Sequence, residues 1–352
     1  MGITYQIAIN GTKIAASRGE LLLDAALKNG LDLPHQCRAG HCGTCCMRLI
    51  SGSVDGGAGT EPGIVHACQC RITGNAALES RHLHAWRSVE GVLRVLRPVS
   101  SDVTEVGIKT KDPLPHHPGQ YALVRFKGYP QRSYSFTHPI LGRPDSRLLW
   151  FHIRHIKEGR VTSELGKRIR RGHRLTLTGP YGTACFQPAQ TNRLLLVATN
   201  TGFAPIWAIA AAALRENPYR TIMIIAGGRT IESLYMAPAL ARLSNFPNVR
   251  IFAVCSRSQN LPLSINPGRP TDYLPLLTPT DLVYACGAPE MVDAVKSVAS
   301  EAGAICYSDP FLPAPADAAA HASLFARAVS LIKRPSRPQL LHASRFCDQQ
   351  IA

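Results

Sequence analysis

Acidic residues and long apolar runs are both scarce in this 352-residue sequence. Only 23 residues are Asp or Glu, against 39 Lys or Arg, which gives a formal net charge of +16. No apolar stretch approaches the roughly 20 residues that a membrane-spanning helix requires. The first residues also lack the basic segment followed by an apolar one that is typical of a secretory signal. We therefore expect a cytoplasmic protein without a membrane partner.

The positive charge is concentrated in the middle of the chain. Residues 1–80 hold six basic and six acidic residues, 81–187 hold nineteen and seven, and 188–352 hold fourteen and ten. No basic motif interleaved with aromatic residues and no known DNA-reading pattern occurs, so nucleic acid is not expected as a partner. The basic middle segment fits an acidic protein or a phosphate-rich cofactor, and the alternative is an ordinary solvated face.

Hydrophobic patterning divides the chain into three domains and a tail. Residues 1–85 alternate short strands with one helix, as in a small α+β domain. Residues 88–187 contain short strands broken by Pro and Gly, which predicts an antiparallel barrel with one helical insertion at 160–170. Residues 190–313 repeat strand, loop and helix, which predicts a doubly wound parallel α/β sheet. For residues 314–352 the alternatives are a loosely packed extension and a basic amphipathic helix at 318–334.

Cysteine is plentiful and clustered. Six of the eleven cysteines precede residue 71, which indicates metal or redox chemistry rather than a disulfide framework. Cys37, Cys42 and Cys45 have the Cys-x4-Cys-x2-Cys spacing of a plant-type [2Fe–2S] loop. The small residues between them let backbone amides point at sulfur. Zinc is the alternative, but it prefers paired Cys-x2-Cys units.

The fourth ligand of such a cluster must come from another part of the chain. Cys68 and Cys70 are the two candidates, because both follow the loop within the same domain. Cys46 is adjacent to Cys45, so it points to the opposite side of an extended backbone. We expect Cys46 to be a packed core thiol.

Arg132-Ser-Tyr-Ser135 has the residue types that a flavin site needs. Arg132 supplies a cation for the phosphates, Tyr134 an aromatic ring for the isoalloxazine, and Ser135 a hydroxyl near the reactive ring nitrogen. Residues 159–162 are predicted to open a helix whose N-terminal amides bind the pyrophosphate. The alternative is that the tyrosine is an ordinary core residue of its strand.

A nucleotide site is predicted at the carboxyl edge of the α/β sheet, where open sheets bind such ligands. Thr201 and Gly202 lie between the first strand and the first helix, placed to approach a nicotinamide ribose or phosphate. Cys286 ends another strand and is expected to face the same crevice, the alternative being an inert buried thiol. The Gly-x-Gly-x-x-Gly fingerprint of a Rossmann domain does not occur here.

Taken together, these motifs resemble those of a known enzyme family. Their order is similar to the NAD(P)H-dependent ferredoxin reductase component of bacterial aromatic-ring-hydroxylating dioxygenases, especially the naphthalene dioxygenase reductase group, over about residues 3–313. The resemblance implies a β-grasp ferredoxin domain, an antiparallel β-barrel FAD domain and a doubly wound NAD(P) domain. The motifs that carry it are "CRAGHCGTC", "HACQCRITGNAALE", "PGQY", "FHIR", "GRVTSEL", "LTGPYGTA", "CGAPEMV" and "YSDPFLP".

The resemblance also implies individual site residues. The cluster ligands would be Cys37, Cys42, Cys45 and Cys68. The flavin contacts would be Arg132, Ser133, Tyr134, Ser135, His152, Arg154, Gly159, Val161 and Thr162. The pyridine nucleotide would meet Thr201, Gly202, Ser256, Arg257 and Cys286. The residues at the reacting centre would be Ser135, Cys286 and Phe311, the last lying over the flavin.

Three features depart from the family pattern. Thr199 and Asn200 replace the glycines usual before the Thr-Gly pair, the turn at 56–65 is short, and the tail after residue 313 has no counterpart. The nucleotide preference stays open. Ser256 and Arg257 suit a 2′-phosphate, as in plant-type ferredoxin–NADP reductases, whereas the close family often favours NADH or accepts both.

The implied activity is that of an NAD(P)H:ferredoxin oxidoreductase. Electrons would pass from NADH or NADPH through FAD and a [2Fe–2S] cluster to a ferredoxin or a terminal oxygenase. One alternative keeps this electron chain but serves a monooxygenase or a deoxysugar dehydratase. Another is a non-enzymatic redox module that uses the cluster alone, which the flavin and nucleotide motifs disfavour.

Overall fold

The computed structural model describes residues 3–312, with gaps at 32, 36–37, 41–42, 60–61, 81–86, 143–144, 188–191 and 259. Backbone contacts group the chain into two units, Met1–Leu312 and Pro313–Ala352. The amphipathic helix considered at 318–334 lies outside the described residues.

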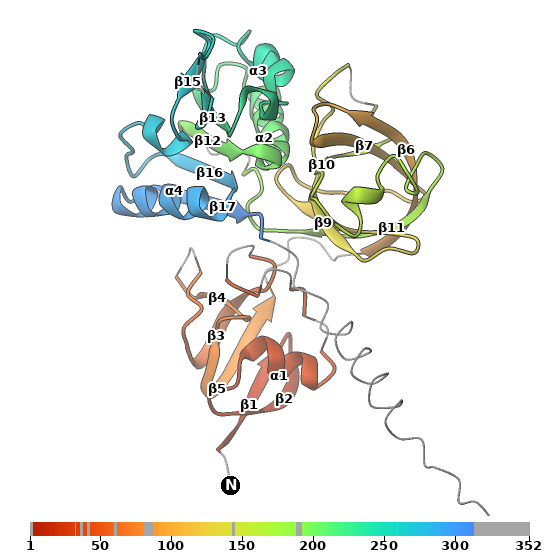
Figure 1. The fold of residues 1–352 in the computed structure, drawn as a ribbon. Coiled ribbons are helices and arrows are strands. Elements are labelled where there is room, and N and C mark those ends of the chain that lie inside the picture. Colours follow the sequence, from red (N-terminus) through yellow and green to blue (C-terminus); the bar gives the residue numbers. More distant parts are fainter. Residues whose placement is uncertain are drawn as a thin grey trace, which may run out of the picture. The chain divides into compact units, whose positions relative to one another are not determined.

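The first sheet has five strands in the order β2-β1-β5-β3-β4 (Figure 1). Its elements are β1 (Thr4–Ile9), β2 (Thr12–Ser17), α1 (Leu22–Lys28), β3 (Cys46–Asp55), β4 (Ile64–His66) and β5 (Arg71–Ser80). β1 pairs with β5 in parallel, and the other pairs are antiparallel. Helix α1 buries one side, including Leu22 and Leu23, against the sheet. This mixed sheet with one helix confirms the predicted ferredoxin-type α+β fold.

The second sheet is antiparallel, with its six strands in the order β10-β7-β6-β11-β8-β9. Its strands are β6 (Arg87–Pro98), β7 (Val103–Thr110), β8 (Tyr121–Phe126), β9 (Arg132–Ser135), β10 (Leu149–Arg154) and β11 (Arg174–Tyr181). An isolated antiparallel bridge between Thr137 and Trp150 joins its two edges. The predicted barrel is confirmed, and its alternate inward side chains form one hydrophobic core.

The prediction of a helix at residues 160–170 is wrong. Only a three-residue 3₁₀ turn forms there, η1 (Thr162–Glu164). Thr162 Oγ1 accepts the backbone N–H of Ile156 at 3.0 Å, which folds the segment back on the preceding loop. Gly166 then adopts a φ of 83°, a left-handed conformation that ends helical propagation.

The third sheet is parallel throughout, with strand order β15-β14-β13-β12-β16-β17. Its strands are β12 (Leu194–Thr199), β13 (Ile222–Gly228), β14 (Val249–Cys255), β15 (Ile265–Pro267), β16 (Leu282–Gly287) and β17 (Ile305–Pro310). Its helices are η2 (Asn200–Gly202), α2 (Phe203–Glu216), η3 (Ile231–Ser233), α3 (Ala237–Leu243), η4 (Pro270–Tyr273) and α4 (Pro289–Glu301).

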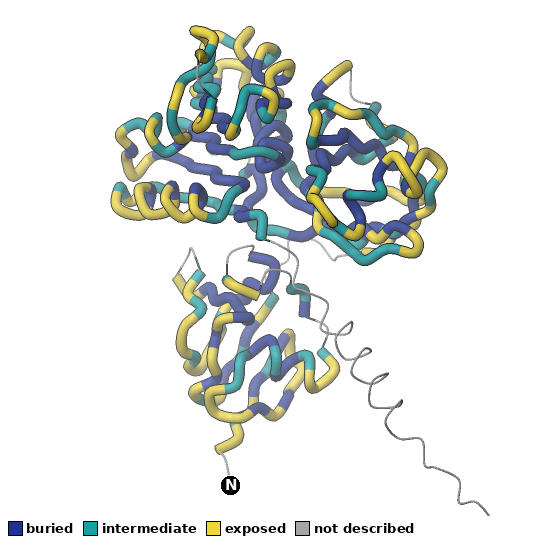
Figure 2. The backbone as a smooth tube through the Cα atoms, in the orientation of Figure 1, coloured by how far each residue is buried: buried dark blue, intermediate teal, exposed yellow. Residues whose placement is uncertain are grey.

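Both faces of this parallel sheet are covered. Leu194, Leu196 and Ala198 of β12 pack with α2 and α3, whereas Leu195 and Val197 pack with α4. The central strands are accordingly buried along their length, while α4 alternates buried and exposed positions (Figure 2). This confirms the predicted doubly wound sheet and explains why its strands are continuously apolar. Among the described residues, no helix combines the length and apolarity needed to cross a membrane.

Candidate functional site

Backbone bonds bring Cys68 beside the loop that contains Cys45. Ala67 donates its N–H to the Cys45 carbonyl at 3.0 Å, and Gln69 Nε2 donates to the Arg38 carbonyl at 2.7 Å. Cys68 is the residue between Ala67 and Gln69, so the backbone at Cys68 lies next to the predicted cluster loop. Cys45 and Cys68 are both buried in the core of the first sheet. The other two predicted ligands, Cys37 and Cys42, lie outside the described residues.

The other two cysteines of this domain occupy different positions. Cys46 begins β3, pairs with His66 of β4 and is buried. Cys70 is fully buried, and its carbonyl accepts the N–H of Leu22, the first residue of α1, at 2.9 Å. The carbonyl of Cys70 is therefore bonded to the helix. The two neighbours of Cys68 are bonded to the loop, and one of them, Ala67, also accepts the N–H of Leu23 in α1.

The cluster loop also contacts the second sheet. Thr44, next to Cys45, forms a hydrogen bond between its hydroxyl and that of Tyr121, and both residues are buried. Tyr121 is the first residue of β8 and pairs with Ser135 of β9. The hydrogen bond from Thr44 to Tyr121 therefore connects the predicted cluster loop with β8, which pairs with the predicted flavin strand β9. No motif spacing in the sequence reveals this connection.

Strand β9 presents the predicted flavin residues in alternation. Arg132 and Tyr134 occupy one face of the strand, and Ser133 and Ser135 the other. The Tyr134 hydroxyl is buried and has no hydrogen-bond partner among the described residues. Burial raises the pKa of Tyr134 far above its ordinary value, an effect that the positive charge of Arg132 partly opposes. A protonated, unpartnered hydroxyl at this place fits a polar ligand.

The predicted pyrophosphate loop is compact. Gly159 accepts hydrogen bonds from the N–H and the hydroxyl of Ser163, at 3.0 and 2.7 Å. A side chain at position 159 would collide with the hydroxyl of Thr162. Val161 and Thr162 are buried. The loop therefore brings together the three residues that the sequence assigned to the pyrophosphate, although without the expected helix.

His152 lies between the second and third sheets. Its Nε2 is 3.1 Å from the carbonyl of His138, and its Nδ1 is 3.2 Å from the hydroxyl of Tyr235. Burial lowers the pKa of His152 to about 3, so the ring is neutral. Because a carbonyl only accepts, Nε2 carries the proton and Nδ1 accepts from Tyr235. Buried Glu105 lies close by, its Oε1 3.9 Å from Nε2.

This buried neutral histidine makes stability depend on pH. Its pKa is about 3 when folded and near 6.5 when unfolded, so between these values the unfolded chain binds more protons. Stability should therefore fall as the pH falls from 7 to 5, by about 2 kcal/mol from this residue. Urea unfolding measures this loss. In the His152→Gln variant, the free energy of unfolding should fall between pH 7 and pH 5 by about 2 kcal/mol less than it does in the wild-type protein. Equal losses in the two proteins would contradict the assignment.

Arg154 and Tyr235 show where sequence reasoning was incomplete. Arg154 Nε donates to Asp102 Oδ2 at 3.1 Å, an ion pair within the barrel. Tyr235, which no motif singled out, is buried and contacts His152 edge-on as well as by its hydroxyl. Its only sequence signal is an aromatic residue shortly after a predicted strand.

The carboxyl edge of the third sheet brings the predicted nucleotide residues together. Gly202 packs so tightly against the backbone of Cys286 and Gly287 that an added Cβ would overlap the Cys286 carbonyl oxygen. The hydroxyl of Thr199 accepts the N–H of Ala288 at 2.8 Å, which joins the same two loops. Phe311 donates its N–H to the Gly287 carbonyl at 2.7 Å. The Thr-Gly, Cys-Gly and C-terminal aromatic motifs therefore meet at one place.

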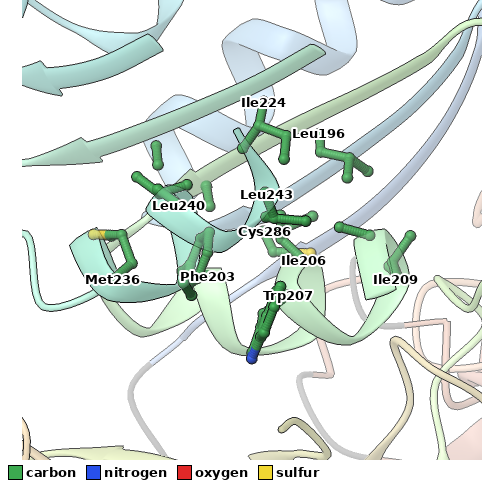
Figure 3. Close-up of a cluster of buried hydrophobic side chains, with 14 of the residues drawn as sticks. Leu196, Phe203, Ile206, Trp207, Ile209, Ile224, Met236, Leu240, Leu243 and Cys286 are labelled. Atoms are coloured by element: carbon green, nitrogen blue, oxygen red, sulfur yellow. The ribbon is translucent and has the colours of Figure 1, made fainter. Parts of the chain in front are cut away.

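Cys286 is buried in the described structure, as in the alternative of a buried thiol, and its contact with the nucleotide stays a prediction. Its side chain is fully buried, in the same apolar cluster as Phe203 and Trp207 (Figure 3). Burial raises the pKa of Cys286 well above that of a free thiol, so it is protonated. The physical reason is that Cys286 belongs to the apolar cluster that packs the sheet against α2 and α3. A role at the reacting centre would need Cys286 to act as a neutral thiol.

Two arginines flank the next strand ends. Ser256 donates its N–H to the Gly228 carbonyl at 3.2 Å, and Arg257 donates to the Arg229 carbonyl at 2.9 Å. Ser256, Arg257 and Arg229 are all exposed. Arg229 was missed from sequence, although its place directly after the apolar β13 was the available signal.

The cofactor sites therefore fit the residues that surround them. The Cys45 and Cys68 loops offer thiolate ligands, the unpartnered Tyr134 hydroxyl lies beside a cation, and the Gly202 edge leaves no room for a side chain next to Cys286. The second and third sheets also share contacts, since the Thr137 hydroxyl donates to the Ala204 carbonyl at 2.7 Å.

Comparisons with known proteins agree with this arrangement. Residues 7–73 match a family described as a 2Fe-2S iron-sulfur cluster binding domain, and residues 196–297 match an oxidoreductase NAD-binding domain. The naphthalene 1,2-dioxygenase system ferredoxin–NAD(P)(+) reductase component of Pseudomonas putida is 32% identical over 327 residues, covering 86% of this chain and 97% of the relative. The corresponding reductase of the naphthalene 1,2-dioxygenase/salicylate 5-hydroxylase systems of a Ralstonia species is 29% identical, covering 85% and 95%.

A solved structure supports the same fold. The Amycolatopsis cytochrome P450 reductase has a TM-score of 0.65 and 26% identity, covering 88% of this chain and 99% of that one. The matched families indicate an oxidoreductase with a [2Fe–2S] cluster domain and an NAD-binding domain. From its motifs, its three sheets and these relatives, we conclude that the chain belongs to the family of NAD(P)H-dependent ferredoxin reductase components of aromatic-ring-hydroxylating dioxygenase systems.

Proposed function

We propose that this chain passes electrons from NAD(P)H to a separate ferredoxin, or directly to the terminal oxygenase, of a dioxygenase that hydroxylates aromatic rings. We place it in the cytoplasm, where a protein with eleven cysteines stays reduced. We assign residues 1–85 to the ferredoxin domain, 88–187 to the FAD domain and 190–313 to the NAD(P) domain. Residues 314–352 are left without a role.

The proposed site divides the work among these residues. FAD, when bound, would supply hydride acceptance and one-electron release, and a [2Fe–2S] cluster would supply one-electron transfer. Cys37, Cys42, Cys45 and Cys68 hold the iron. Arg132 neutralises flavin phosphate charge, and Tyr134 lies against the ring. Thr201 and Gly202 hold the nucleotide, while Phe311 excludes water from the reacting face.

The observation that carries the proposal is the hydrogen bond between Thr44 and Tyr121. Thr44 adjoins the predicted cluster ligand Cys45, and Tyr121 pairs with Ser135 in the flavin strand. The cluster loop would therefore lie close to a flavin bound beside Ser135, at the same end of the β8–β9 strand pair. A carrier that used the cluster alone would not need this link.

A visible spectrum before and after NADH tests the proposal directly. Purified holoprotein should show flavin and iron–sulfur absorbance, and both should bleach on anaerobic addition of NADH or NADPH. Bleaching of the flavin alone would show that electrons do not pass from the flavin to the cluster, which would contradict the proposed path. Bleaching of neither would refute the function.

One specific observation favours a second kind of electron acceptor. The solved relative with 26% identity is a cytochrome P450 reductase, so the same electron chain could serve a monooxygenase. Acceptor assays with purified ferredoxin, dioxygenase and monooxygenase components discriminate the two, because the competent pair gives the higher kcat/KM.

The nucleotide preference depends on the exposed arginines at the edge of the sheet. If Arg257 holds a 2′-phosphate, Arg257→Ala should lower kcat/KM for NADPH about tenfold and leave that for NADH within twofold, because only NADPH carries the extra anion. Arg250→Ala, which removes an exposed arginine from the opposite end of β14, is the matched control. Parallel losses with the two nucleotides would show that Arg257 does not discriminate between them.

A further inference from the structure

A basic groove runs across the outside of the barrel. It has a volume of about 820 Å³ and lies over strands β6, β7, β8 and β11 and the turn at 127–128. Six cations line it, with one carboxylate, that of Glu90. The cations are Arg94, Lys109, Lys111, Arg125, Lys127 and Arg174, and all six are exposed.

Strand pairing creates this concentration of charge. Lys109 pairs with Val92, Val92 pairs with Arg174, and Lys127 donates its N–H to the Arg174 carbonyl at 3.0 Å. Positions distant in the sequence thus form one row across four neighbouring strands, about 14 Å wide at ~4.8 Å per strand spacing. Within the described residues, none of the six cations is in an ion pair, so their charge is available to a partner.

The dimensions and chemistry of the groove indicate a protein as its occupant. A row of this width exceeds a single phosphate or diphosphate group. The lining contains no aromatic side chain on which a nucleobase could stack, and Glu90 would repel a regular phosphate backbone. Carboxylates on a folded protein can be spaced to meet the cations and avoid Glu90.

We propose that this groove is the docking surface for an acidic protein electron acceptor. The proposal rests on the function proposed above, because only a protein that delivers electrons needs such a partner. Charge complementarity of this kind accelerates encounter and orients the partner, which suits an acceptor that must bind, receive one electron and leave.

The position of the groove is compatible with electron delivery. Thr176, which lines it, is five residues before Tyr181 at the other end of β11, or about 16 Å along the strand. Tyr181 pairs with Tyr121, which contacts Thr44 of the cluster loop. A partner of about 100 residues has a radius of gyration near 13 Å, so one small protein can occupy the groove and still reach that end of the strand.

Charge reversal in the holoprotein tests the proposal. The groove variant combines Lys109→Glu, Lys111→Glu and Lys127→Glu. The control combines Arg215→Glu, Arg250→Glu and Lys296→Glu, which are exposed residues of the third sheet and its helices and change the net charge equally. Flavin and iron content and the NADH–ferricyanide rate verify that each variant is intact. The probe is a small acidic plant-type [2Fe–2S] ferredoxin at low ionic strength.

The groove variant should lower kcat/KM for this ferredoxin at least about tenfold, and the control by less than about threefold. The difference should disappear in high salt, while ferricyanide reduction stays within twofold in both variants. Equal losses in the two variants, or none, would overturn the proposal. So would a wild-type protein that bleaches with NADH but reduces the ferredoxin without salt dependence, or a groove variant that loses only binding of single-stranded RNA. Failure of the wild type to bleach at all would instead refute the proposed function.

Discussion

Replacing Cys68 by Ser should abolish the iron–sulfur centre. The neighbours of Cys68 bond to the cluster loop, Ala67 to Cys45 and Gln69 to Arg38, which supports the prediction that its thiolate is the fourth ligand. We expect Cys68→Ser to lose its iron and its visible cluster bands, and protein-acceptor turnover to fall at least about a hundredfold, since ligand loss removes the energy of metal binding.

Cys70→Ser is the matched control for this change. Cys70 is two residues away and equally buried, but its backbone is tied to Leu22 of α1 rather than to the loop. Iron content and the visible spectrum should stay close to wild type in this variant. Flavin content and NADH–ferricyanide turnover, which bypasses the cluster, should persist in both. Loss of iron from Cys70→Ser with retention in Cys68→Ser would reverse the assignment.

Adding one methyl group at Gly202 should have the second large effect. The new Cβ would overlap the carbonyl oxygen of Cys286 and approach the backbone of Gly287, and neither group is the end of a flexible side chain. The two loops must separate to relieve the overlap, at a cost of about 1–3 kcal/mol. We expect Gly202→Ala to lower kcat/KM for NADH and NADPH alike by at least about tenfold, because the nucleotide edge is displaced.

Gly74→Ala controls for the substitution itself. Gly74 does not have a left-handed φ, and an added Cβ would meet the hydroxyl of Ser53 at 3.0 Å and its carbonyl oxygen at 3.9 Å. This variant should keep wild-type turnover and lose little stability. Steady-state kinetics and urea unfolding measure both quantities. Wild-type kcat/KM in Gly202→Ala would show that the contact with Cys286 does not position the nucleotide edge.

Local pattern accounted for most of the fold, and its one clear failure is instructive. The barrel strands are short segments broken by Pro and Gly, and the strands of the parallel sheet are continuously apolar. Both patterns are visible in the sequence, so the strands could be predicted. The segment at 160–170 has good helix formers, yet Thr162 turns its hydroxyl back to Ile156 and Gly166 adopts a left-handed φ. A side chain that bonds to a preceding loop overrides propensity, and pattern alone does not detect it.

Part of the candidate site could likewise be predicted from local sequence, and part could not. Residue type and position at a strand end pointed to Thr201, Gly202 and Cys286 as neighbours, because parallel strands end at one edge. They did not show that Cys286 would be buried in the apolar cluster beneath α2 and α3, nor that Tyr235 would contact His152. Burial depends on packing between segments far apart in the chain.

The spacing of three cysteines, the alternation of short strands and the continuous apolar strands are local properties, and they suffice to identify a cluster loop, a barrel and a nucleotide sheet in this chain. Long-range contacts alone join Gln69, next to Cys68, to the cluster loop, place Thr44 against Tyr121, and gather Lys109, Lys127 and Arg174 into one groove. The reason is physical: a hydrogen-bond register or a packed loop joins residues 18 to 77 positions apart in these cases, and such a pairing leaves no period or motif in the sequence.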